Sequence, residues 1–177
     1  MAQRPRPDAT NGGDAGMRLR RAVETDWPAI WPLWHEVVAA GDTYCYDPRT
    51  DIESGRALWF GPVPEQTWVA EQRGQVLGTY HLSPNQAGPG AHIANASYMV
   101  RSDARGRGLG RRMVEHSLRT AAAAGFRGVQ FNAVAATNVH AIRLYHELGF
   151  ATIGTVPAGF RHPRAGFTDL LIMFREL

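Results

Sequence analysis

Apolar residues recur along this chain with two periods, one typical of helices and one typical of strands. Trp27, Ile30, Trp34 and Val38 follow helical spacing, and we predict helices at residues 27–38, 51–60, 109–124 and 138–148. Runs rich in β-branched and aromatic residues predict strands at residues 17–22, 67–71, 76–82, 93–101, 128–134, 150–156 and 168–174. Pro32 should kink the first helix, and the tryptophans of that helix belong either to the core or to an aromatic binding wall.

Glycine and proline mark the connections between these elements. Gln72 to Gln75 predicts a hairpin turn, and Gly125 and Gly149 stand where a helix commonly ends. Loops are expected at residues 41–48, 83–90 and 157–166. The order of elements (β, α, α, three strands, α, β, α, two strands) predicts an α/β or α+β fold with a mixed sheet and helices on its faces.

The length of 177 residues suits one domain, which we place at residues 17–177. The first sixteen residues are rich in Pro, Gly, Asp and Ala, so we expect a disordered tail there. Met17 directly precedes the first predicted strand and is an alternative start.

Positive charge is concentrated in one segment of the chain. All 19 basic residues are arginine, and seven of them lie between Arg101 and Arg127, against only Asp103 and Glu115. Charge gathered in this way favours a discrete anionic ligand over a polyanion. We therefore expect no nucleic-acid partner.

The single cysteine, Cys45, excludes an internal disulfide and fits a reducing compartment. No apolar run approaches the roughly 18 to 20 residues that cross a bilayer. We expect a cytoplasmic protein that binds neither a membrane nor a metal.

The segment Arg105 to Arg112 reads RGRGLGRR and lies between a predicted strand and a predicted helix. Glycines let the backbone approach a ligand closely, and the first amides of a helix have no partner within the helix. Such a turn attracts phosphate. Its alternative role is tight packing of the strand against the helix.

Three other anion sites fit this turn less well. A P-loop needs a Gly-Lys-Ser/Thr sequence, and the chain has no lysine. A dinucleotide fingerprint starting at Gly106 would place its third glycine on Arg111, about a hundred residues too late in the chain. A nucleic-acid site lacks interleaved aromatic residues.

Arg105, Gly108 and Gly110 fit the pattern R/Q-x-x-G-x-G/A, and residues 138–150, NVHAIRLYHELGF, fit N-x-x-A-x-x-x-Y-x-x-x-G-F. In this order, the two motifs resemble the signatures of the GNAT superfamily of acetyl-CoA-dependent acetyltransferases, and the resemblance covers residues 17–177. It implies a GNAT fold, with a twisted, mixed and mostly antiparallel sheet of about six or seven strands and about four helices. The central strands would splay to form an acetyl-CoA cleft.

The resemblance also implies residues that bind acetyl-CoA. The pyrophosphate of coenzyme A would bind the turn formed by Arg105, Gly106, Arg107, Gly108, Leu109, Gly110 and Arg111. Free amides of Met99, Val100 and Arg101 would bind the pantetheine arm, and the amide near Met99 would polarise the thioester carbonyl. Asn138 would contact the same arm. Tyr145 would protonate the departing thiolate, although its helical spacing suits a core residue equally well.

The acceptor side is less defined. Asn95 and Asn132 stand inside apolar strand runs, where an asparagine needs hydrogen-bond partners. They either hold the acceptor, with Asn132 taking part in catalysis, or bridge neighbouring backbone. The loop at residues 41–48 offers further candidates that could receive a cationic amine: Tyr44, Tyr46, Asp42 and Asp47.

No general base stands out. His81, His92 and Glu71 are candidates, and an ordered water relay would leave no trace in the sequence. Cys45 has no histidine at a recognisable spacing, which argues against a covalent acetyl-enzyme.

Short segments such as Leu77 to Tyr80 and Phe131-Asn132 are similar to yeast N-acetyltransferases that detoxify proline analogues such as azetidine-2-carboxylate. The resemblances together imply transfer of an acetyl group to a small-molecule amine, such as an amino acid or its analogue, by direct attack in a ternary complex. They also imply a homodimer. The alternatives are an acetyltransferase for protein N-termini or lysines, and a CoA-binding regulatory module without catalysis.

Overall fold

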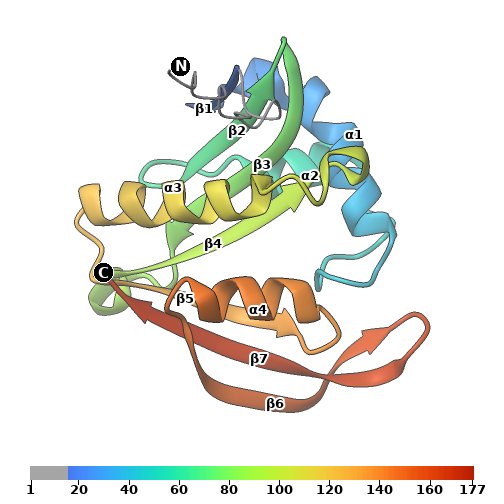
Figure 1. Cartoon of the computed structure of the whole chain (residues 1–177), viewed down its shortest axis with the longest axis vertical. Coiled ribbons are helices and arrows are strands. Elements are labelled where there is room, and N and C mark those ends of the chain that lie inside the picture. Colours follow the sequence, from blue (N-terminus) through green and yellow to red (C-terminus); the bar gives the residue numbers. More distant parts are fainter. Residues whose placement is uncertain (1–15) are drawn as a thin grey trace, which may run out of the picture.

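The structure is a computed structural model that describes residues 16–177. The predicted tail therefore lies outside the described residues up to residue 15. In the described range, seven strands form one sheet in the order β1-β2-β3-β4-β5-β7-β6 (Figure 1). The strands are β1 (Met17–Arg21), β2 (Gln66–Gln72), β3 (Gln75–Pro84), β4 (Ile93–Val100), β5 (Gly128–Ala135), β6 (Ala151–His162) and β7 (Gly166–Glu176).

Within the same range, four α-helices flank the sheet, and three short 3-10 turns lie at Glu24–Asp26, Gly88–Gly90 and Ser102–Ala104. The α-helices are α1 (Trp27–Ala39), α2 (Ile52–Trp59), α3 (Leu109–Ala123) and α4 (Val139–Glu147). Only β4 and β5 pair in parallel, and every other neighbouring pair is antiparallel. The predicted fold class, with a mixed and mostly antiparallel sheet, is confirmed.

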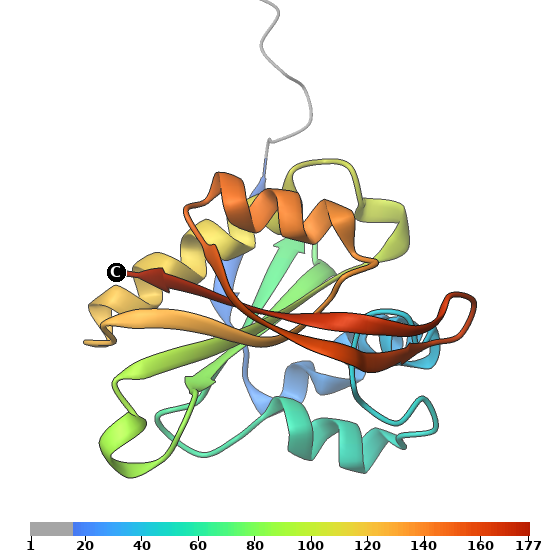
Figure 2. The ribbon, with the colours of Figure 1, turned by 90° about the horizontal axis from the view of Figure 1, so that it is seen from below.

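Two cores lie on opposite faces of the sheet. Helices α3 and α4 cover one face, and α1 and α2 cover the other (Figure 2). The first core packs Tyr80, Met113 and Phe131 together beneath α3 and α4. The second holds Trp34 and Trp59, both fully buried, which confirms the core role predicted for Trp34.

Local chemistry explains where the helices begin and end. The Asp51 carboxylate accepts a hydrogen bond from the Ser54 amide at 2.8 Å and caps the start of α2. Gly125 and Gly149, which follow α3 and α4, have φ of +85° and +84°. These left-handed conformations favour glycine and end both helices as predicted. Pro32 lies inside α1, which continues through it.

The predicted loop at residues 157–166 is wrong. Strand β6 continues to His162 and pairs with β7 from Phe160 onward. Pro157, which suggested the loop, is accommodated by an irregularity between Val156 and Phe160, where Ala158 has φ of +51°. An edge strand tolerates proline at a bulge because that residue donates no ladder hydrogen bond. The chain therefore ends in a long hairpin that extends beyond the helices (Figure 2).

No helix in residues 16–177 is both long and apolar enough to span a membrane.

Candidate active site

The sheet opens between β4 and β5. Their parallel pairing is limited to Ile93 with Gly128 and Ala94 with Val129. Beyond these pairs, β4 remains paired with β3 and β5 remains paired with β7. The two central strands diverge (Figure 1), so the predicted splay is confirmed.

Strand register decides which amides of β4 face this cleft. The Arg101 amide donates to the Leu77 carbonyl at 2.9 Å, and the Asn85 amide donates to the Ile93 carbonyl at 2.8 Å. Because the register between these bonds is uninterrupted and bonded pairs alternate, the odd-numbered residues of β4 bond to β3. The residues whose amides face the cleft are therefore Ala96, Tyr98 and Val100.

Two of the three predicted amides are consequently misplaced. Met99 pairs with Thr79, and its side chain is 1% exposed within the core beneath α1. The Arg101 amide also points to β3. Val100 does face the cleft. The prediction was wrong by one residue. Because the amides of successive residues in a strand point to opposite sides, a shift of one residue directs an amide toward β3 instead of toward the cleft.

Tyr44 bonds to the cleft-facing backbone of β4. Its hydroxyl donates to the Tyr98 carbonyl at 2.7 Å and accepts from the Tyr98 amide at 2.9 Å. Burial, and then the nearby phenol of Tyr145, raises the pKa of Tyr44 well above its usual value. Tyr44 thus supplies the two hydrogen bonds that β5 would make in an unbroken sheet.

A stack of four aromatic rings holds Tyr44 in this position. The stack runs from Trp31 through Trp34 and Tyr46 to Tyr44, with successive ring centroids 5.6 Å apart and interplanar angles of 19°, 29° and 6°. Offset stacking of this kind contributes about 0.5–1.5 kcal/mol per pair beyond burial. The loop at residues 41–48 is therefore anchored to α1 by its aromatic residues.

A cavity of about 220 Å³ lies where this loop meets the cleft. It brings together Tyr44, Asn95, Asn132, Asn138 and Tyr145 of the predicted site residues. The remaining lining consists of Thr43, Cys45, Tyr46, Ala96, Ser97, Tyr98, Phe131, Ala133, Val134, Ala135 and Ala141. Residues from one loop, two strands and one helix thus converge on a small chamber.

The two asparagines from the strands have different surroundings. Asn132 lies where the register between β5 and β7 is interrupted; its amide donates to Asn85 Oδ1 at 2.6 Å, and its Oδ1 accepts from Gln130 at 2.8 Å. The Asn95 side chain makes no hydrogen bond to another residue in the described range. Neither side chain bridges neighbouring backbone, so the structural alternative for this pair is not supported.

Tyr145 is both a core residue and a cavity residue. Its ring packs against Phe131 and Phe150, with centroids 4.5 Å and 5.8 Å away. The hydroxyl has no hydrogen-bond partner among residues 16–177. Burial raises the pKa of Tyr145 above its usual value, so the phenol keeps its proton at neutral pH.

Asn138 has a role that the sequence interpretation did not include. Its side-chain oxygen accepts from the Ala141 amide at 3.3 Å and caps the start of α4. The same residue lines the cavity. The N-terminus of α4 and the chamber are thus fixed by one side chain.

The glycine turn forms a second end of the site. Gly106 and Gly108 have φ of +75° and +76°, and a Cβ on either would meet no atom within 4 Å. No side chain caps the start of α3. The first backbone hydrogen bond of this helix runs from the Arg112 amide to the Gly108 carbonyl. The amides of Leu109, Gly110 and Arg111 therefore lack partners within the helix. This is an anion-binding arrangement.

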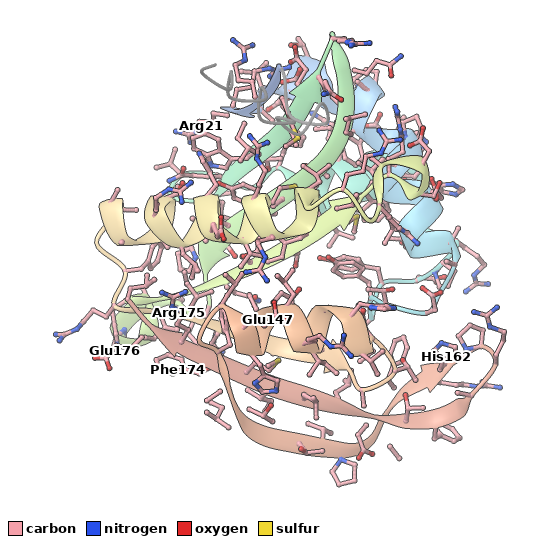
Figure 3. All side chains as sticks on the ribbon, in the orientation of Figure 1. Arg21, Glu147, His162, Phe174, Arg175 and Glu176 are labelled. Carbon is pink, nitrogen blue, oxygen red and sulfur yellow. The ribbon has the colours of Figure 1, made fainter. Side chains whose placement is uncertain are left out.

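The arginines around the turn are not equivalent. The Arg111 guanidinium bonds to Glu147 on α4 and so links α3 to α4; Figure 3 shows Glu147 on α4 below α3. Arg101 pairs with Asp103 at 2.6 Å. Arg105 reaches the Val100 carbonyl at 3.5 Å, and both Arg105 and Arg107 are exposed. These last two are best placed to meet an anion.

The candidate bases lie outside the cavity lining. One nitrogen of His81 is 2.9 Å from the Trp59 carbonyl and the other is 3.3 Å from Glu65, while burial lowers the pKa of His81. His92 lies 3.0 Å from the Pro89 carbonyl, and Glu71 pairs with Arg20 at 2.7 Å. Burial raises the pKa of the Cys45 thiol and so disfavours its nucleophilic form.

Among the polar residues that line or support the cavity, the sequence interpretation assigned no role to Asn85, Ser97 or Tyr98. The alternation of Asn95, Ser97 and Met99 on one face of a strand was a usable signal for Ser97. No local pattern announced Asn85, because its role depends on a contact with a residue 47 positions away.

Known proteins share both sequence and shape with this chain. Residues 27–150 match the model of the acetyltransferase (GNAT) family. A solved GCN5-related N-acetyltransferase from Kribbella flavida is 47% identical with a TM-score of 0.88, covering 92% of this chain and 98% of that one.

Two curated relatives are more distant. N-acetyltransferase aca1 of Schizosaccharomyces pombe is 33% identical over 113 residues, which is 63% of this chain and 54% of that protein. An L-methionine sulfoximine/L-methionine sulfone acetyltransferase of Pseudomonas paraeruginosa is 28% identical over 145 residues, covering 78% of this chain and 83% of the relative. This chain thus matches about half of the length of the first relative and most of the second. With the family model spanning most of the fold and both ends of the cleft, the chain belongs to the GNAT family of acetyltransferases.

Proposed function

We propose that this acetyltransferase uses acetyl-CoA to acetylate the amine of a small molecule, such as an amino acid or an amino-acid analogue, by direct attack in a ternary complex. The observation that carries the proposal is the 220 Å³ chamber beside the opening between β4 and β5. A chamber of this size suits a small amine better than a peptide segment. The methionine sulfoximine/sulfone acetyltransferase among the relatives supports the same substrate class.

The residues at the other end of the cleft fit coenzyme A. The open space beside Gly106 and Gly108, together with the uncapped amides of α3, suits a pyrophosphate. Arg105 and Arg107 would add charge-assisted hydrogen bonds to it. The cleft-facing amides that do not bond to Tyr44, those of Ala96 and Val100, would hold the pantetheine arm and polarise the carbonyl. Acetyl-CoA, when bound, supplies the activated acetyl group.

The chain's own residues would then orient the acceptor and manage the proton. Asn95 and Asn132 would hold the acceptor, and the Tyr145 phenol would donate a proton to the leaving thiolate. Burial raises the pKa of Tyr145, so the phenol carries at neutral pH the proton that this role needs.

Acetyl-CoA titration followed by thermal unfolding tests the donor half of the proposal. We expect a rise in melting temperature that grows with ligand concentration. A thiol-release assay over amino acids, proline analogues, sulfoximines and short peptides tests the acceptor half. Faster release with peptides than with every small amine would contradict the proposal, and binding without release would indicate a non-catalytic module.

The proposals for location and assembly remain predictions. We propose a cytoplasmic enzyme on the basis of its one cysteine, which is a free thiol. For the homodimer, the terminal hairpin offers apolar side chains that are well exposed: Ile153 is 57% and Phe167 is 74% accessible. Light scattering measures the mass in solution and decides between monomer and dimer.

A further inference from the structure

The chamber next to β4 has no charged lining. None of its sixteen lining residues is Asp, Glu, Lys, Arg or His. Its titratable groups are the phenols of Tyr44, Tyr46, Tyr98 and Tyr145 and the thiol of Cys45, and burial raises the pKa of every one of them. All five groups are therefore neutral near pH 7.

No charged group of the surrounding elements is among the residues that line the chamber. In the loop at 41–48, Asp42 accepts a hydrogen bond from the Thr43 hydroxyl, and Asp47 pairs with Arg49. On α1, whose tryptophans hold this loop, His35 and Glu36 are exposed. On β3, His81 faces Glu65. On α4, Glu147 bonds to Arg111, His146 lies 3.0 Å from the Phe150 carbonyl, and His140 and Arg143 are exposed. Strand β5 carries no titratable residue, and β4 carries only Tyr98.

The hydroxyl of Tyr44 has one unused capacity. A phenol has one proton to donate and two lone pairs that accept. In this structure the proton goes to the Tyr98 carbonyl, and one lone pair receives the Tyr98 amide. The remaining lone pair receives no donor from residues 16–177, so it can accept from a ligand N–H or O–H. Tyr44 is thus fixed as a hydrogen-bond acceptor at the cleft.

We propose that the acceptor binds in this chamber as its uncharged amine and donates one N–H to Tyr44 Oη. The inference rests on the proposed acetyl transfer. An ammonium entering the chamber would lose its hydration without meeting a counter-charge, which strongly disfavours it. A neutral amine loses much less and keeps the nitrogen lone pair that must attack.

The proton balance is then complete without an enzyme base. The amine nitrogen forms a bond to the acetyl carbon, and the carbon–sulfur bond breaks. The nitrogen releases one of its own protons, and the departing sulfur ends as a thiol, with Tyr145 placed to relay that proton. An ammonium would have to lose a further proton, for which the lining offers no base.

The inference narrows the acceptor to small amines of low basicity. The α-amino group at a polypeptide N-terminus has a pKa near 7.7–8.0 and a lysine side chain one near 10.4, so at pH 7.5 their neutral fractions differ by roughly a few hundred-fold. An amine as basic as lysine would therefore enter the chamber only through a very small neutral fraction, whereas a weakly basic amine would enter readily. The lysine acetyltransferase alternative is correspondingly disfavoured.

The decisive experiment measures kcat/KM against pH for two acceptors. One is the best amine found in the thiol-release panel, and the other is its analogue with fluorine on the carbon next to the amine-bearing carbon. Fluorine makes the ammonium more acidic and changes its size little. We expect the midpoint of the kcat/KM profile against pH to move down with the fluorinated ammonium's own pKa. A midpoint that stays fixed, or activity that falls once the ammonium has lost its proton, would overturn the inference and indicate an enzyme base such as His81.

Tyr44→Phe tests the hydrogen bond, because the ring stack is kept while the hydroxyl is removed. We expect the acceptor KM to rise about tenfold, with a smaller change in the acetyl-CoA KM. Tyr80→Phe is the matched control, since that buried hydroxyl bonds to His116 at 2.7 Å beneath α3 and lies outside the chamber. It should change stability without changing the acceptor KM.

Equal acceptor KM values for Tyr44→Phe and the native chain would refute the hydrogen bond between Tyr44 and the acceptor. Absence of thiol release with every amine would instead refute the proposed function and this inference with it, whereas turnover with a fixed midpoint would refute the inference alone.

Discussion

The two ends of the cleft are built in opposite ways. The end that we propose for the donor, at the start of α3, consists mainly of backbone amides, two left-handed glycines and exposed arginines. The end that we propose for the acceptor is made of side chains from a loop, two strands and α4, and none of its lining residues is charged. The pyrophosphate of acetyl-CoA is constant and highly charged, so one local backbone conformation is enough to bind it. A chamber for the acceptor must instead be assembled from residues that are distant in the sequence, so its selectivity depends on how these residues pack.

Tyr145 lines the chamber at the acceptor end, and loss of its hydroxyl should have the largest effect. We expect Tyr145→Phe to lower kcat by about 10²-fold or more, the usual range for a general acid, with both KM values changed little. The ring packing against Phe131 is retained, and the hydroxyl has no partner in residues 16–177 to lose. Steady-state kinetics with both substrates varied checks this. An unchanged kcat would assign Tyr145 to the core alone.

Gly108 tests the claim that the donor end depends on backbone. We expect Gly108→Val to raise the acetyl-CoA KM at least tenfold, because a side chain would occupy the open space where we propose that the pyrophosphate binds. Strain at φ of +76° would also cost about 1–3 kcal/mol. Gly125→Val at the other end of α3 is the control, since Gly125 has φ of +85° and equally open surroundings. Similar donor KM values for the two variants would show that strain, and not the ligand site, explains the loss.

Asn132 tests the claim that side chains build the acceptor end. We expect Asn132→Ala to raise the acceptor KM about five- to tenfold, the loss of about one hydrogen bond, and to leave the acetyl-CoA KM unchanged. Gln130→Ala is a graded control because Gln130 only orients Asn132, through a 2.8 Å bond. It should give a smaller rise. An effect of Asn132→Ala on the donor KM alone would break the division between the two ends.

The contact between Arg111 and Glu147 should matter least, although it joins α3 to α4. Its side chains are 41% and 49% exposed, and such pairs contribute about 0–1 kcal/mol. We expect Glu147→Gln to lower the melting temperature slightly and to change both KM values less than about twofold. A larger change in either KM would mean that the two ends are coupled through these helices.

The contrast between the two ends also explains what the sequence could reveal. The turn from Arg105 to Arg111 and the start of α4 at Asn138 depend on neighbours within a few residues, so their spacing predicted both elements, although not the cap that Asn138 forms. The predicted role of the Met99 amide was wrong because the direction of each amide in β4 depends on how β4 pairs with β3. The predicted loop at residues 157–166 was wrong because a proline such as Pro157 interrupts a central strand but is tolerated in an edge strand.

At the acceptor end, the sequence supplied candidates but no contacts. Asn95, Asn132 and Tyr44 were named because polar residues in apolar runs or aromatic loops need an explanation. Their convergence on one chamber, and the bond from Tyr44 to Tyr98, required the fold. The absence of charged residues from the chamber lining could not be predicted from the sequence, because the lining combines residues of four separate segments.

The stack of Trp31, Trp34, Tyr46 and Tyr44 also gives the loop at residues 41–48 an intrinsic spectroscopic signal. Two indole rings with centroids 5.6 Å apart couple their electronic transitions, and Trp34 is in turn stacked on Tyr46 of the chamber. Near-ultraviolet circular dichroism and tryptophan emission should therefore respond when an acceptor displaces these rings, with no added label. The segment from Arg101 to Gly125 contains no tryptophan, and among residues 16–177 only the Trp68 ring packs against a ring of α3, that of His116, with centroids 4.6 Å apart. The donor should therefore give a smaller signal than the acceptor, so that the filling of the two ends could be followed separately.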